Sequence, residues 1–328
     1  MALVALLIFI EFAVVFLAIF VKDFIKSKKE SFKYHKSEVI VAFILITPAV
    51  VLAFFFVLLP IVLSLGFSFT DYSQNFPNVF DLSGGDGFGN FRDLFEELAS
   101  KGDIYHALIN TAIFVAGVVP LQIGLALGLA LFVNNKRRGT IIFKVCFFAP
   151  VAISLTVTAF FWKTVLSSAE DGIMNSIFQA FGLAPREFLG KDGILFWMII
   201  ISAWQGCGFQ MLIFLSALGN IRKDLYEAAK VDGANVFQRF VTITLPGLKP
   251  TMLYILITVF IGACRVLIQP LLLDNGFNTY SMSISLYMYW QGKKMSHVGY
   301  SCAVALMMTL VIGAITFLQR KLLGEKKK

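Results

Sequence analysis

The sequence predicts an all-α integral membrane protein with seven membrane-spanning helices. Its 328 residues are 58% hydrophobic and only 15% charged, and its mean hydropathy is +0.80, which lies outside the range of soluble domains. Several apolar runs reach the length of about 20 residues with which a helix crosses a bilayer. The gaps between these runs hold most of the charge.

Seven apolar runs are the candidate spans, in chain order 2–21, 39–66, 107–133, 142–165, 193–218, 251–273 and 299–319. The first run lacks the basic start and the short apolar stretch ending in small residues that mark a cleaved signal peptide. A dense lysine cluster follows it, as after a stop-transfer segment, so we expect a retained extra N-terminal helix. Glu11 within it is either an ion or proton site, or a protonated or interfacial carboxyl against another helix; the lack of an obvious partner favours the second.

The positive charges predict the topology. Lys and Arg gather in the segments 22–37, 134–141, 219–250 and 320–328, whereas 67–104, 166–192 and 274–298 are poorer in them. By the positive-inside rule the first set is cytoplasmic and the second external. We therefore expect the N-terminus outside and the C-terminus inside. The net charge of +8 then reflects topology and contact with anionic lipid, not nucleic-acid binding.

The residue types that could form a catalytic or metal site do not occur at the spacings that such sites require. All four cysteines (Cys146, Cys207, Cys264 and Cys302) fall within predicted spans, and none has a CxxC spacing, so neither a disulfide framework nor a metal site is indicated. The three histidines are scattered. No GxxxxGK[ST] phosphate loop occurs, so we expect no catalytic residues here and no cofactor in this chain.

The polar segment between the runs 193–218 and 251–273 is the most informative one. It reads Glu227-Ala228-Ala229-Lys230-Val231-Asp232-Gly233-Ala234 and runs on to Ile243-Thr244-Leu245-Pro246. We predict a short helix over about 223–231, a sharp turn at Gly233, and a second helix from Ala234 that cannot run past Pro246 unbroken. Glu-Ala-Ala alone is common, because all three residues favour helix. The full arrangement is narrower, and it resembles the EAA loop of the membrane subunits of ATP-binding-cassette (ABC) importers.

The resemblance extends over most of the chain, from about Pro48 to Leu322, and is to the sugar-type permeases of the maltose and glycerol-phosphate group. Its further motifs are Leu59-Pro60-Ile61, Phe67-Ser68-Phe69-Thr70-Asp71-Tyr72, Gly89-Asn90-Phe91, Asn110-Thr111, Pro120-Leu121-Gln122, Phe147-Phe148-Ala149-Pro150, Trp162, Asp171-Gly172-Ile173-Met174-Asn175, Trp204, Leu215-Ser216-Ala217-Leu218 and Gly299-Tyr300-Ser301-Cys302-Ala303. Two features depart from the family pattern: no proline precedes Glu227 closely, and Asp274-Asn275-Gly276-Phe277-Asn278 replaces the family's Thr-x-Gly-Gly-Pro turn.

The resemblance implies the type-I ABC importer permease fold, with six core helices plus the extra N-terminal helix, in a bacterial cell membrane. It implies a second homologous permease subunit, an ABC ATPase dimer that binds ATP and Mg, and an extracytoplasmic solute-binding protein as partners. The ATPase-coupling residues would be Glu227, Ala228, Ala229, Asp232, Gly233, Ala234, Leu245 and Pro246. The expected divisions are 1–37 (N-terminal helix and basic linker), 38–104 (first core helix and external loop), 105–320 (permease core with the coupling loop 219–250) and 321–328 (basic tail).

Arg265 is the candidate substrate contact. It lies in the middle of the fifth predicted core span, where a guanidinium is costly unless it faces water, a carboxylate or an anionic ligand. It is either paired with an acid on another helix or subunit, or it lines the translocation path with Gln269 and Cys264 beside it. The second alternative favours a sugar or oligosaccharide that carries an acidic group. One alternative is an importer of a non-sugar phosphorylated or anionic solute. Another is an ion-coupled secondary transporter. That class needs ionisable residues near the middle of the membrane, and only Glu11 and Arg265 are clear intramembrane charges, which argues against it.

Overall fold

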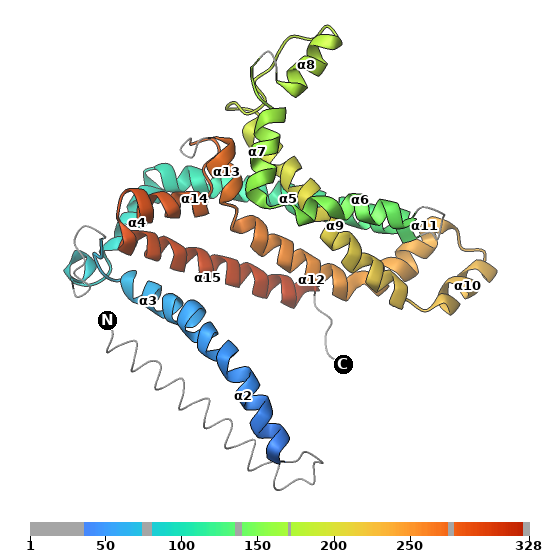
Figure 1. Cartoon of the computed structure of the whole chain (residues 1–328), viewed down its shortest axis with the longest axis horizontal. Coiled ribbons are helices and arrows are strands. Elements are labelled where there is room, and N and C mark those ends of the chain that lie inside the picture. Colours follow the sequence, from blue (N-terminus) through green and yellow to red (C-terminus); the bar gives the residue numbers. More distant parts are fainter. Residues whose placement is uncertain (1–35, 74–80, 135–139, 170–171, 275–278, 324–328) are drawn as a thin grey trace. The chain divides into compact units, whose positions relative to one another are not determined.

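The structure is a computed structural model that describes residues 36–73, 81–134, 140–169, 172–274 and 279–323 (Figure 1). The predicted first span with Glu11, most of the basic linker after it and the end of the basic tail lie outside the described residues. Within the described part all regular secondary structure is helical, apart from one isolated bridge between Thr70 and Leu82. This confirms the all-α prediction.

The helical elements follow one another along the chain, with η marking a 3-10 or π-helical turn. They are α2 (Lys36–Ala53), η1 (Phe54–Leu58), α3 (Leu59–Phe67), η2 (Ser83–Gly85), α4 (Gly89–Ala99), α5 (Asp103–Asn134), α6 (Thr140–Ala152), α7 (Leu155–Val165), α8 (Ile173–Ala180), α9 (Ile194–Asn220), α10 (Lys223–Val231), α11 (Val236–Arg239), η3 (Phe240–Thr244), α12 (Leu245–Cys264), α13 (Ile268–Leu273), α14 (Ile284–Tyr289), η4 (Trp290–Lys294) and α15 (Val298–Leu323).

Five helical stretches among the described residues are long and apolar enough to cross a bilayer. They are Ile44–Phe67, Asp103–Asn134, Ile194–Asn220, Val236–Leu273 and Val298–Leu323, and they correspond to the predicted spans 39–66, 107–133, 193–218, 251–273 and 299–319. The pair α6 and α7 adds a sixth crossing if it forms one span. The total of seven spans and the orientation of the chain remain predictions.

The predicted span 142–165 differs from the structure, because two helices replace the expected one. α6 ends at Ala152, α7 begins at Leu155, and their axes are bent by 98°. Pro150 lies in the last turn of α6, where it removes a backbone donor. Ser154 then takes an extended conformation and caps α7, its hydroxyl accepting the Val157 N–H at 3.3 Å.

The described chain separates into two compact units, the first of which contains the residues up to Asn90 together with His297–Ala303. Three predicted motifs meet in this unit. The Asn90 side-chain amide donates to the carbonyl oxygens of Ser68 and Thr70, both at 3.0 Å, and the Gly299 N–H donates to the Tyr72 carbonyl at 3.0 Å. A Cβ at Gly299 would collide with the Thr70 carbonyl oxygen, so this contact requires glycine.

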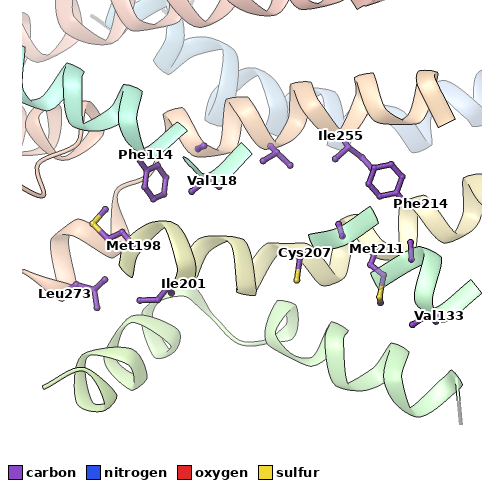
Figure 2. Close-up of a cluster of buried hydrophobic side chains, with 14 of the residues drawn as sticks. Phe114, Val118, Val133, Met198, Ile201, Cys207, Met211, Phe214, Ile255 and Leu273 are labelled. Carbon is purple, nitrogen blue, oxygen red and sulfur yellow. The ribbon is translucent and has the colours of Figure 1, made fainter. Parts of the chain in front are cut away.

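The second unit, Phe91–Ser296 with the rest of α15, has α9 at the centre of its core. This helix packs against α5, α6 and α12. Figure 2 shows the buried cluster, to which α9 contributes Met198, Ile201, Cys207, Met211 and Phe214, α5 contributes Phe114, Val118 and Val133, and Ile255 and Leu273 come from α12 and α13.

Small residues allow α9 to approach its neighbours closely, as is typical of helices packed in lipid. A Cβ at Gly208 would collide with the Phe147 carbonyl oxygen of α6. A Cβ at Gly206 would collide with the side-chain amide of Gln122 on α5. Gly208 therefore allows the close approach of α9 to the backbone of α6, and Gly206 leaves room for the side chain of Gln122.

Candidate functional site: a capped elbow and a glutamine-lined cavity

The predicted short helix at the Glu-Ala-Ala motif is confirmed as α10, Lys223–Val231. Asp224 lies in its first turn and Lys230 in its last, which suits the helix dipole. Arg222, at the N-cap position, forms an ion pair with Asp224 at 3.0 Å, but both side chains are about three-quarters exposed, so the pair adds little stability. Glu227, Ala228 and Lys230 are exposed on this helix.

The predicted turn at Gly233 is also confirmed, with a φ of 79°. The Ala234 N–H donates to the Ala229 carbonyl at 2.9 Å, and the Gly233 N–H donates to the Lys230 carbonyl at 3.1 Å. This pair of bonds is the Schellman motif, which ends a helix at a left-handed residue. Asp232, the last residue before the turn, donates its N–H to the Ala228 carbonyl at 3.0 Å.

A capping box opens α11 immediately after the turn. The Gln238 N–H donates to the Asn235 side chain at 2.8 Å, and the Asn235 N–H donates to the Gln238 side chain at 2.7 Å, so two otherwise free donors are satisfied reciprocally. We call Lys223–Arg239 the elbow. Because both of its helix ends at the turn are capped, the angle between α10 and α11 is locally fixed.

As predicted, the second helix does not run past Pro246 as one unbroken α-helix, since α11 ends at Arg239 and α12 begins at Leu245. The chain stays helical from Val236 to Cys264 by passing through the π-helical turn η3, in which the Leu245 N–H donates to the Phe240 carbonyl five residues earlier. Leu245 and Pro246 thus form the first turn of α12, where a proline needs no donor. The hydroxyls of Tyr226 and Thr244 lie 2.9 Å apart and join α10 to η3.

The elbow exposes apolar side chains that a solvated loop would not need. Val231 is 88% exposed, Val236 75% and Phe237 72%. A cavity of about 630 Å³ lies beside them, lined by the ends of α5 and α9, by the elbow and by η3. An exposed apolar patch with Glu227 and Lys230 near it is typical of a protein-docking surface.

The second candidate site is at the end of α12. Arg265 was expected in the middle of a span, but α12 ends at Cys264 and α13 begins only at Ile268. Arg265 to Leu267 form a non-helical break between the two helices. Arg265 is exposed, and its guanidinium has no ion pair or hydrogen bond with any residue that the structure describes. The predicted pairing with an acid is therefore absent from this part of the chain.

Arg265 and Gln269 line one cavity of about 320 Å³ formed by α5, α7, α9, α12, the break and α13. The polar residues around it are Gln122, Ser202, Gln205, Gln210, Thr258, Arg265 and Gln269. Cys264 is buried and does not line it. The structure thus places two of the three expected path residues at the cavity.

Three glutamines of this cavity were missed from the sequence: Gln122, Gln205 and Gln210. All are at least nine-tenths buried. The Gln205 amide donates to the Ile153 carbonyl, freed by the bend between α6 and α7, and to the Thr158 hydroxyl, both at 3.1 Å. The carboxamide oxygens of Gln205 and Gln210 are buried without a hydrogen-bond partner. Side-chain amides inside apolar runs are costly, and that signal was available in the sequence.

Two further contacts join the helices around the cavity. The Ser202 hydroxyl donates to the Gln269 carboxamide oxygen at 2.6 Å, which links α9 to α13. Lys163 on α7 donates to the Leu272 carbonyl at 2.9 Å, which links α7 to α13. Lys163 lies within a predicted span, as does Lys144 of α6, so the count of intramembrane charges made from the sequence was incomplete.

The comparisons with known proteins agree on one family. The model of the "Binding-protein-dependent transport system inner membrane component" matches residues 121–327. The arabinooligosaccharides transport system permease protein AraP of Bacillus subtilis is 32% identical over 227 residues, 68% of this chain and 72% of that protein. The lactose transport system permease protein LacF of Rhizobium radiobacter is 33% identical over 232 residues, 68% and 77% of the two chains.

The same fold occurs in a solved structure. A chain of a bacterial alginate ABC transporter, crystallised with an alginate pentasaccharide-bound periplasmic protein, superposes with a TM-score of 0.73 at 23% identity. The match covers 87% of this chain and 94% of that one.

Proposed function

Because this chain belongs to the binding-protein-dependent transport system inner membrane component family, we propose that it is the permease subunit of an ATP-driven importer of a sugar or oligosaccharide. The names of AraP and LacF support a saccharide. The single observation that carries the solute class is the cavity, which is lined by buried side-chain amides, by two hydroxyls and by Arg265, which has no partner among the described residues. Amides and hydroxyls bond sugar hydroxyls, and a guanidinium suits a carboxylate.

The architecture follows from the same proposal. The chain is a type-I ABC importer permease with six core helices and an extra N-terminal helix, seven spans in all, in a bacterial inner membrane. Its N-terminus is external and its C-terminus cytoplasmic. Its parts are the N-terminal helix and linker (1–37), the first core helix and external loop (38–104), the core (105–320) and the tail (321–328).

The elbow is the coupling surface in this proposal. A separate ABC ATPase dimer binds ATP and Mg and docks on the elbow, and a second permease subunit and an external solute-binding protein complete the importer. Glu227 contacts the ATPase, and the capped turn at Gly233 transmits its movement to α12 without bending. The doubly capped geometry and the exposed patch of Val231, Val236 and Phe237 support this role.

Uptake of neutral and acidic oligosaccharides by Arg265→Ala and Arg265→Gln, at matched expression, tests the solute proposal. A charge-assisted hydrogen bond is worth about 1.5–3 kcal/mol, so we expect the half-saturation concentration for an acidic solute to rise about ten- to hundredfold. Uptake of a neutral solute should change much less. Arg186→Gln is the matched control, because Arg186 is exposed and lies outside the cavity.

The outcome also separates the alternatives. Normal uptake of every transported solute by both Arg265 variants would refute a role in the path. The alternative importer would be favoured if the parent protein transports no saccharide but transports a phosphorylated or other anionic non-sugar, and if the Arg265 variants lose that uptake. Uptake that needs an ion gradient and no ATP would favour the secondary transporter.

A further inference from the structure

The break between α12 and α13 leaves a backbone carbonyl to be satisfied from elsewhere. The N–H groups of Arg265 and Val266 still bond back into the last turn of α12, to Gly262 at 3.2 Å and Ala263 at 3.3 Å. The carbonyl of Val266 instead accepts a hydrogen bond of 2.6 Å from the Ser283 hydroxyl, 17 residues later. An unpaired buried carbonyl would be costly. This bond therefore fixes the backbone immediately after Arg265.

Ser283 has a second role at the same oxygen. It is the N-cap of α14, and its hydroxyl oxygen accepts the Leu286 N–H at 3.2 Å. Its side chain is 2% exposed, so water does not compete for either bond. One hydroxyl thus joins the start of α14 to the wall of the cavity.

The segment Thr279–Ser283, which we call the strap, is also held by α5. The Asn110 amide donates to the carbonyl oxygens of Thr279 at 2.7 Å and Met282 at 3.1 Å. The Ile284 N–H donates to the Thr111 hydroxyl at 3.0 Å. The strap cannot shift along α5 without breaking these hydrogen bonds. A displacement of α5 or α14 would therefore also displace the backbone at the break.

We propose that Ser283 is a positioning residue, which sets the direction of the Arg265 side chain through the Val266 carbonyl. This inference rests on the proposed function, in which Arg265 lines the solute path and the strap belongs to the external loop 274–298. In that setting, a movement of the external loop changes the orientation of the guanidinium at the cavity. The strap is thereby a direct link between the outside of the importer and its solute site.

A spin label tests the positioning without any solute. In the full complex with the four native cysteines replaced, the label is placed by Arg265→Cys, and Ser283 is changed to Ala or to Thr. We expect Ser283→Ala to raise the ratio of mobile to immobile label about fivefold, which is the effect of losing the one of its two hydrogen bonds that reaches the break. Ser283→Thr keeps the hydroxyl and should match the parent. A label at Phe209→Cys, exposed on α9, should not respond.

Two controls separate positioning from general loosening. Ser154→Ala removes the N-cap of α7 and no bond to the break, so the label at position 265 should be unchanged. Thr111→Val removes the hydroxyl that accepts the Ile284 N–H, at nearly constant side-chain volume, and should mobilise the label as Ser283→Ala does. This variant replaces Ser283→Ala in the test if Ser283→Ala does not assemble. An immobile label in Ser283→Ala or in Thr111→Val, or equal mobilisation at position 209, overturns the proposal.

A double-mutant uptake measurement relates this inference to the solute site. Ser283→Ala should weaken the preference for acidic over neutral solutes in the parent protein and have no further effect on that preference in Arg265→Ala. Additive effects would show that Ser283 does not act through Arg265. If Arg265→Ala itself leaves the preference unchanged, the proposed function fails, while the spin-label result still decides the positioning claim.

Discussion

Gly233 offers the sharpest test of the elbow. Its φ of 79° lies in the left-handed region, which costs a residue with a Cβ about 1–2 kcal/mol. No heavy atom outside Gly233 and its two chain neighbours lies within 4 Å of a Cβ built at this position, so Gly233→Ala adds this conformational cost and no clash with other residues. Asn tolerates the region better than Ala. Pro requires a φ near −65° and loses the N–H that bonds Lys230, so it is incompatible with the turn.

We therefore expect the coupling between transport and ATP hydrolysis to be strongest with Gly at position 233, weaker with Asn, weaker again with Ala, and far weaker with Pro. A cost of about 1 kcal/mol lowers the population of the formed turn about fivefold relative to the open one. The readouts are co-purification of the ATPase and solute-stimulated ATP hydrolysis in membranes. Gly219→Ala is the control, since Gly219 also has free space around it but a helical backbone. Full coupling in Gly233→Pro, or equal damage by Gly219→Ala, would refute the reasoning.

Three further predictions concern packing and topology. Gly208→Ala should destabilise the purified subunit by about 1–3 kcal/mol, because the new methyl must displace α6. Gly124→Ala is the control and should not destabilise it, because Gly124 has free space around it. Equal melting temperatures of the two variants would contradict the contact at Gly208. Asn90→Ala should cost about 2–4 kcal/mol by leaving two carbonyl acceptors without their donor, and an unchanged thermal unfolding midpoint would show that Asn90 is dispensable. In a cysteine-free variant, an impermeant thiol reagent added outside should label a cysteine at position 85 and spare one at position 30; the opposite pattern would invert the topology.

The elbow could be predicted because the interactions that form it are local. The residues of α10 favour helix, Gly233 allows the left-handed turn, and every bond that closes the turn joins residues at most five apart. The positions of the five spans that the structure confirms were predictable for a similar reason, since length and hydropathy alone decide which stretches can cross a bilayer.

The interruptions of the helices could not be predicted in the same way. The bend after Ala152 is stabilised by Gln205, 52 residues away from Ile153, and the break after Cys264 by Ser283. Lys163 and Leu272 are 109 residues apart. A helix that ends in an apolar run needs partners for its freed carbonyl groups, and here distant side chains supply them, which no local pattern identifies. Arg265 and Gln269 could be singled out as polar residues, but not their meeting with Gln205 and Gln210.

The π-helical turn before Pro246 has a consequence for the direction of the elbow. Such a turn holds one residue more than an α-helical turn, and one residue corresponds to a rotation of about 100° around the helix axis. Deleting a single residue within Phe240–Thr244 would leave the elbow's own sequence intact. It would nevertheless swing the elbow around the axis of α12 and separate Tyr226 from Thr244. The face that the elbow presents to a partner is thus encoded in a residue count as well as in the side chains.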